Sequence, residues 1–261
     1  MTTTPATPIA RSVPSMGGFN LTFLGLEVRR MMRNRRTLVF ALVMPSVFFL
    51  LFGTSDGYNG TSVGRGNVTA YVMISLAVYG AMLSTTSGGA MVSVERAQGW
   101  SRQLRLTPLR PAAYIAVKLL VAMVIGLASV VVVFVVGAAV GASMQGWVWV
   151  TTALVAWIGS VVFAAFGLFM GYLMPSENVM QILGPGLALL ALAGGLFTGP
   201  VTSGWFATFS QLMPTYGLSQ LAHAALTGDG FTVASVLNVL VWATVFTGGA
   251  VLLFRRDTRR V

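Results

Sequence analysis

Long uncharged runs of apolar residues alternate with short polar loops along this chain, and each run is about as long as a helix that crosses a membrane. A crossing takes about 20 apolar residues in a helix. One uncharged stretch, residues 119–176, has room for two crossings and is divided by Gly-Ala-Ser-Met-Gln-Gly at residues 141–146. The pattern therefore predicts an all-α integral membrane protein with six transmembrane helices, over residues 37–55, 68–93, 119–140, 147–176, 179–197 and 233–254.

The segment before the last crossing, residues 205–226, is mostly uncharged but carries two glutamines and His223. Pro214 divides it into two short helices, and Thr215 is the expected N-cap of the second. A seventh crossing here would move the C-terminal arginines to the opposite side of the membrane. We therefore expect an external re-entrant helix pair before the last span. His223 lies among Ala and Leu, so we expect it to be packed rather than to act as a ligand or a base.

An amphipathic pattern precedes the first crossing. Apolar residues recur there at spacings of three and four, and charged residues occupy the other positions. The pattern predicts a helix over residues 19–36 that lies parallel to the membrane surface. The apolar stripe consists of Leu21, Leu24, Val28, Met31 and Met32, and the charged positions are Glu27, Arg29, Arg30 and Arg33.

The chain is accordingly expected to have four parts. Residues 1–18 are rich in Thr, Pro, Ser and Gly and are predicted to be a disordered cytoplasmic tail. The interfacial helix over residues 19–36 follows, and residues 37–254 form the six-span transmembrane domain. Residues 255–261 are a basic cytoplasmic tail.

The placement of basic residues predicts the orientation of these spans. Of the 16 Lys and Arg residues, all except Arg65 fall within residues 11–36, 96–118 or 255–260. Cytoplasmic loops of membrane proteins collect Lys and Arg. We therefore expect both termini and the loop at residues 95–118 to be cytoplasmic, with Arg65 and Asp229 external, in a multi-pass protein of the bacterial cell membrane. This placement also accounts for the net charge of +10 without a nucleic-acid partner.

Composition then excludes several kinds of chemistry. The chain is 56% hydrophobic and 8% charged and has no Cys, so disulfides and thiolate metal sites are excluded. No Asp or Glu falls within a span, which argues against a proton- or sodium-coupled carrier. A phosphate-cradling loop needs Gly-Lys-Ser/Thr, but the single lysine, Lys118, follows Val117. We therefore expect no enzyme activity, metal or cofactor on this chain, and ATP and Mg²⁺ on a partner if transport is active.

The loop at residues 94–109 carries the main candidate for a contact with a partner. Its sequence predicts a short helix with Glu95 in the first turn and a stop at Pro108. Trp100 and Leu104 are four residues apart and form an apolar knob among arginines. This pattern fits equally an anchor for a soluble protein's groove and a helix that lies on anionic lipid.

A family resemblance favours the protein contact. The loop sequence Glu95-Arg96-x-x-Gly99, followed by Leu104 and Thr107-Pro108-Leu109, resembles the signature loop of export-type ABC permeases of the second class, the daunorubicin-resistance and polysaccharide-export superfamily. Residues 27–36, Pro45, Phe52-Gly53 and Met213-Pro214 resemble further features of that family in the same order. The resemblance covers nearly the whole chain.

Such permeases pair with a separate cytoplasmic ATPase, and two permeases and two ATPases form one exporter. The resemblance thus implies two ATPase copies as partners and a second permease copy, expected to make a homodimer. It also implies that the loop couples the ATPase to the spans. The residues given this coupling role are Glu95, Arg96, Gly99, Trp100, Leu104, Thr107 and Pro108.

The path of the substrate is less strongly marked in the sequence. Phe48, Phe49 and Phe52 in the first span and Phe197 in the fifth suit an amphipathic solute, although lipid-facing or packing residues have the same pattern. The predicted function is the permease subunit of an ATP-driven exporter of a hydrophobic or amphipathic compound such as an antibiotic. The alternatives are an exporter of a lipid or glycan, and a membrane sensor or immunity subunit that does not transport.

Overall fold

The computed structural model describes residues 20–99, 111–199 and 203–259, and these residues are almost entirely helical. The expected all-α class is confirmed. The first elements are α1 (Leu21–Met32), α2 (Arg35–Leu38), the π-helical turn η2 (Val39–Val43), α3 (Met44–Phe52), β1 (Ser62–Val63) and β2 (Gly66–Asn67). Helices α4 (Val68–Ala97), α6 (Pro111–Ala139), α7 (Gly146–Gly159) and α8 (Val161–Leu173) follow. The last elements are α9 (Ser176–Ala193), α10 (Trp205–Gln211), α11 (Pro214–Thr227) and α12 (Val233–Arg259).

Four helical segments of the described chain are long and apolar enough to cross a membrane. They are Val68–Ala97, Ala113–Ala139, Gly146–Leu173 and Val233–Arg256. Two shorter apolar helices, Val39–Phe52 and Gln181–Ala193, occupy the expected first and fifth spans. The protein is therefore a multi-pass membrane protein, while the count of six crossings stays a prediction.

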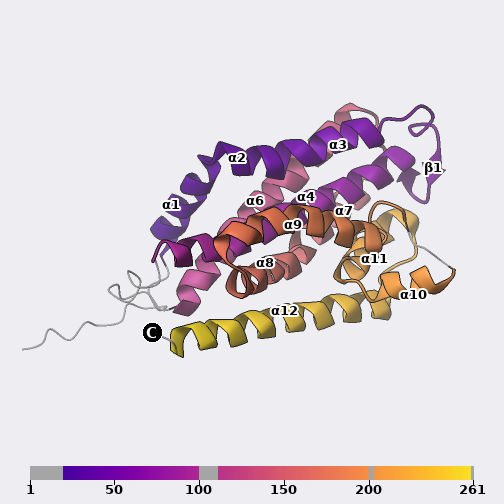
Figure 1. Ribbon diagram of the computed structural model, residues 1–261. Coiled ribbons are helices and arrows are strands. Elements are labelled where there is room, and N and C mark those ends of the chain that lie inside the picture. The colour runs from indigo at the N-terminus through magenta and orange to yellow at the C-terminus, as the bar shows by residue number, and fades with distance from the viewer. Residues whose placement is uncertain (1–19, 100–110, 200–202, 260–261) are drawn as a thin grey trace, which may run out of the picture.

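Helix α4 lies at the centre of the bundle and packs closely against α8. Gly167 makes this approach possible, because a Cβ atom there would collide with the Thr86 carbonyl. Thr85 Oγ1 donates a hydrogen bond to the Ser160 carbonyl at 3.1 Å, and Thr86 Oγ1 donates to the Phe163 carbonyl at 3.2 Å. Small residues and interhelical hydrogen bonds of this kind stabilise helix pairs in membranes. Around this centre, α1 to α3 run along one side of the bundle and α12 along the other (Figure 1).

The first apolar helix is distorted at Pro45. Proline has no amide hydrogen, so the carbonyl of Ala41, four residues earlier, loses its helical donor. The π-helical turn η2 precedes this point, and Ser129 Oγ of α6 donates to the Ala41 carbonyl at 2.7 Å. Both Ala41 and Ser129 are buried. A neighbouring helix thus supplies the hydrogen bond that the proline removes.

The predicted helix pair is present as α10 and α11, although its N-cap prediction was wrong. Met213 is the N-cap of α11 and Pro214 is its first residue, which suits the fixed φ of proline. Thr215 Oγ1 instead donates to the Leu190 carbonyl of α9. Helix α11 ends at Gly228 with a φ of 90°. The external and re-entrant placement of the pair stays a prediction.

Arg65 joins the β-hairpin to the end of α11. Its Nη1 donates to the Ala225 carbonyl at 3.1 Å, its amide donates to the Leu226 carbonyl, and its guanidinium lies 5.1 Å from the ring centre of Trp147. A cation at the C-terminal carbonyls of a helix is favourable. The hairpin, α10 and α11 lie at one end of the bundle, and α1 and the C-terminal end of α12 lie at the other (Figure 1). The β-hairpin, whose turn contains Arg65, therefore lies at the opposite end of the bundle from α1.

Candidate coupling site at the interfacial helix

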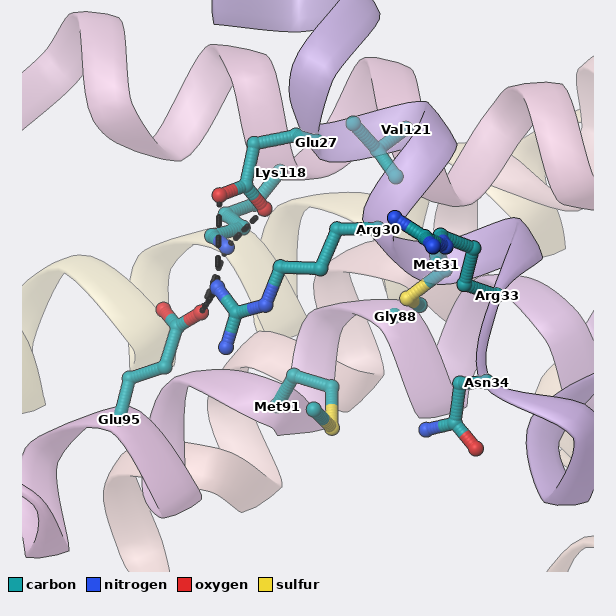
Figure 2. A pocket seen from close by; sticks show the side chains of 10 residues that line it. All are labelled: Glu27, Arg30, Met31, Arg33, Asn34, Gly88, Met91, Glu95, Lys118 and Val121. Atoms are coloured by element: carbon teal, nitrogen blue, oxygen red, sulfur yellow. Dashed lines mark hydrogen bonds and ion pairs between the residues drawn. The ribbon is translucent and has the colours of Figure 1, made fainter.

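A buried ion network joins three helices at the α1 end of the bundle. Lys118 of α6 extends its ammonium group between two carboxylates, 2.7 Å from Glu27 Oε2 of α1 and 2.6 Å from Glu95 Oε1 of α4. The three side chains are only 7%, 12% and 4% exposed, respectively. Figure 2 shows them converging from separate ribbons. Charged side chains that are this deeply buried in the protein are stable only when they are paired.

Two further side chains complete the network. Arg30 Nη1 lies 3.4 Å from Glu27 and 3.6 Å from Glu95, and it closes the network from the exposed side. The Tyr114 hydroxyl donates a hydrogen bond to Glu95 Oε2. Two carboxylates therefore face two cations, so the network as a whole is neutral. Residues that surround it also line a cavity of 270 Å³ at the inner face of α1.

The charged residues of α1 do not all lie on one exposed face, as the sequence predicted they would. Arg29 and Arg33 are exposed, as expected of a polar face. Glu27 was assigned to the same face, and this was wrong, because its carboxylate turns inward to Lys118. The tertiary contact decides the direction of the side chain, since an ammonium group on α6 lies within its reach. The polar face of α1 is accordingly narrower than predicted.

Arg96, in the same turn of α4 as Glu95, connects α4 to α8. Its Nη1 donates to the carbonyls of Gly171 and Tyr172 at 3.2 and 3.3 Å, and its guanidinium lies 5.3 Å from the Tyr172 ring centre. These carbonyls belong to the last turn of α8, where a cation is favourable. Glu95 and Arg96 together connect the end of α4 to α1, α6 and α8.

The structure places three of the seven predicted coupling residues. Glu95 and Arg96 lie in the last turn of α4, and Gly99 follows with a φ of 74°. Such a left-handed glycine is a common end of a helix. The other four, Trp100, Leu104, Thr107 and Pro108, lie outside the described residues.

Two sequence expectations about this region were wrong. Glu95 does not begin a short helix, because α4 continues without interruption from Val68 to Ala97. Lys118 is not in a loop, because α6 begins at Pro111, about two turns earlier. Lys118 and Tyr114 were missed as site residues. A signal was available, since they are four residues apart on one helix face and Lys118 is the single lysine of the chain.

Three of the four predicted substrate-path residues line a common cavity, and the fourth does not. Phe48, Phe52 and Phe197 line a cavity of 500 Å³ between α3, α4 and α9. Phe49 is fully buried in the core and does not line this cavity. The three phenylalanines therefore share one apolar wall, and Phe49 is a packing residue.

His223 lies behind the same cavity and is packed, as the sequence predicts. Its Nδ1 lies 2.8 Å from the Ser219 carbonyl, and its Nε2 lies 3.2 Å from the Tyr71 carbonyl. Its Nε2 is also 3.1 Å from Ser75 Oγ, and that hydroxyl donates to the Tyr71 carbonyl at 3.3 Å. The ring stacks on Tyr71 with a centroid distance of 4.1 Å. Tyr71, Ser75 and Tyr79 line the cavity and were missed, because their spacing on α4 resembles ordinary helix packing.

The described residues contain no group of three or more His, Asp or Glu side chains that would hold a metal ion. What they do contain is a bundle of apolar helices in which buried ion pairs join α1 to the end of the central helix α4. The long apolar helices indicate a multi-pass membrane protein.

Comparison with known proteins agrees with this class. The family model described as "ABC-2 type transporter" matches residues 21–226, and the chain belongs to that family as a membrane permease. It is 28% identical over 230 residues to "Putative transport permease YvfS" of Bacillus subtilis (strain 168), which covers 84% of this chain and 90% of that relative. The resemblance drawn from the loop motif is therefore confirmed. Permeases of this family are generally non-catalytic and generally pair with an ATPase subunit.

Proposed function

We propose that this protein is the permease subunit of an ATP-driven exporter that moves a hydrophobic or amphipathic compound, such as an antibiotic, out of the cell. Two copies of the permease form the membrane part, and two copies of a separate cytoplasmic ATPase energise it. Family membership supports the transport role. The α1 end of the bundle is the cytoplasmic side, and Arg65 and Asp229 are external, in a bacterial cell membrane.

The single observation that carries the coupling role is the ion network at Glu95. The chain leaves α4 immediately after Glu95 and Arg96, whose side chains bind α1, α6 and α8. Removing one partner from a buried ion pair costs about 3–5 kcal/mol. The network therefore stays intact when the following loop is displaced. The ends of α1, α4 and α6 that it joins then move together. Trp100 and Leu104 supply the apolar contact with the ATPase.

The apolar cavity of the bundle supports the class of substrate. Its wall is made by Phe48, Phe52 and Phe197, and it is also lined by Tyr58, shortly before the β-hairpin. In the proposed orientation the end of the bundle with the hairpin is nearest the outside. A hydrophobic or amphipathic compound is suited to such a wall, and a strongly charged one is not.

Purification with the products of the neighbouring genes tests the proposal. The complex should contain an ATPase at one copy per permease, and its ATP hydrolysis should rise with some members of a panel of amphipathic compounds. Stimulation by lipid or glycan precursors alone would instead identify a lipid or glycan exporter. An intact complex that binds a compound without stimulated hydrolysis or transport would identify a sensor, and a permease that is a stable monomer without an ATPase would refute the assembly.

A further inference from the structure

The cavity at the inner face of α1 has an exposed charged side and a buried apolar side. Arg30 and Arg33 line it, and both residues are exposed. They are three residues apart, so their side chains are neighbours on one face of α1. Met31 and Met91 are half-buried and Val121 is buried, and these three side chains make the apolar side. Figure 2 shows the charged and apolar side chains around this one cavity.

Hydrogen-bond donors exceed acceptors around the cavity. Its carboxylates belong to Glu27 and Glu95, and both oxygens of each already accept a hydrogen bond within the ion network. A guanidinium group has five N–H donors. Arg30 uses only Nη1 in its ion pairs, and Arg33 has no side-chain partner among the residues that the structure describes. The cavity therefore has unused donors on two neighbouring arginines.

The charges favour the same kind of ligand. The ion network is neutral by itself, so Arg33 gives the lining of the cavity a surplus positive charge. Arg30 lies 3.4 Å from Glu27 and 3.6 Å from Glu95, which is beyond the usual length of a hydrogen bond, so it is held loosely. An anion between the two guanidinium groups gains charge-assisted hydrogen bonds from both. A cation there would be repelled.

The shape of the site favours a phosphate that is attached to a lipid. Arginine matches phosphate because its planar fork donates two parallel hydrogen bonds. The cavity volume of 270 Å³ is below the range of about 300–1,000 Å³ for sites that enclose a drug-sized ligand, so it holds a head group but not acyl chains. The π-helical turn η2, which follows α2, exposes the apolar side chains of Val39, Phe40 and Val43. Acyl chains that leave the cavity have this apolar surface to contact.

From these observations we propose that the cavity binds the phosphate of one anionic phospholipid, such as phosphatidylglycerol. Arg30 and Arg33 hold the phosphate, Met31 and Met91 contact the glycerol backbone, and the acyl chains lie along η2. The bound lipid neutralises the surplus charge and joins the ion network of α1, α4 and α6 to the bilayer. The site does not depend on the export function. It rests on the expected position of α1 at the membrane surface only in taking the phosphate from a lipid.

Native mass spectrometry of the delipidated full-length permease, without an ATPase, tests the site during titration with phosphatidylglycerol. Arg33→Gln should weaken binding of the first lipid about tenfold, the usual worth of a charge-assisted hydrogen bond. Arg29→Gln is the matched control, because it removes the same charge from an exposed position of α1 that does not line the cavity. It should leave the affinity nearly unchanged. Equal losses in the two variants would show that only the general surface charge attracts lipid, and would overturn the site.

Thermal unfolding in detergent separates the possible sources of the phosphate. Phosphatidylglycerol should raise the Tm of the native permease and of Arg29→Gln but not that of Arg33→Gln. Without lipid, the three proteins should have similar Tm values, because Arg33 is outside the ion network. Phosphatidylcholine should stabilise less, since its choline cation would meet the arginines. An equal rise with inorganic phosphate would identify a site for free phosphate and overturn the lipid assignment.

A soluble protein is the other occupant that a basic surface can attract. If Arg33→Gln lost the ATPase on co-purification but bound phosphatidylglycerol as the native protein does, the arginines would form a protein contact and the proposal would be wrong. The lipid measurements contain no ATPase. Failure of ATP-driven export would therefore leave their outcome unchanged, and failure of lipid binding would leave the exporter intact.

Discussion

Lys118 Nζ of α6 lies 2.6 Å from Glu95 Oε1 of α4, and both side chains are almost completely buried at the point where the chain enters the predicted coupling loop. This ion pair therefore connects the beginning of one membrane helix to the end of the previous one. Through Glu27, the same network also includes α1. A displacement of any of these three elements must be shared by the other two.

Lys118→Met should destabilise the protein strongly. The substitution keeps the length of the side chain but leaves Glu27 and Glu95 buried without their shared cation, at a cost of about 3–5 kcal/mol. Thermal unfolding of the purified permease in detergent would show this as a large fall in Tm. Arg29→Met removes a cation from the exposed face of α1 and should change stability by about 0.5 kcal/mol or less. Equal effects of the two substitutions would contradict the network.

Ser129→Ala should cost about 1–3 kcal/mol, because it leaves the buried carbonyl of Ala41 without a donor. The cost should be smaller in a Pro45→Ala background. Alanine at position 45 supplies the backbone N–H that proline lacks, so the helix can satisfy the carbonyl by itself. A double-mutant cycle on Tm measures this coupling. Additive effects of the two substitutions would show that Ser129 does not compensate for the proline.

Trp100→Ala combined with Leu104→Ala should release or uncouple the ATPase while the permease remains inserted and folded. Truncating anchor residues of a compact interface commonly costs about 2 kcal/mol, or roughly thirtyfold in affinity. Co-purification and substrate-stimulated ATP hydrolysis measure the two effects. Trp147→Ala is a suitable control, since Trp147 is exposed at the opposite end of the bundle. Full association and transport by the double variant would identify the loop as a helix that rests on lipid.

Single cysteines should report the orientation of the protein, because the native chain has none. Asp229→Cys should react with a membrane-impermeant thiol reagent in intact cells, and Arg29→Cys should react only after lysis. Asp229 is preferable to Arg65 as the external position, because Arg65 holds the end of α11. The reverse pattern of labelling would invert the proposed topology.

The repeating pattern of apolar residues determined much of the architecture in advance. It predicted the all-α class, the break between α6 and α7, a helix at the position of α1 and the division of the helix pair at Pro214, each of which depends on local helix chemistry. The loop motif predicted the family. Helix ends were less accurate: α4 extends through Glu95 and α6 begins well before Lys118, because a charged residue ends an apolar run but does not end a helix.

Only the tertiary structure decided which neighbour each helix face meets. Periodicity placed Glu27 on the charged side of α1, but the ammonium group of Lys118 turned it inward. Among the phenylalanines, Phe49 entered the core while Phe48 and Phe52 faced a cavity, although all three lie within two turns of one helix. The spacing of residues along a helix fixes which side chains share a face. Whether that face meets an ion, a packed helix or an open cavity depends on segments far away in the sequence, and their approach is set by packing.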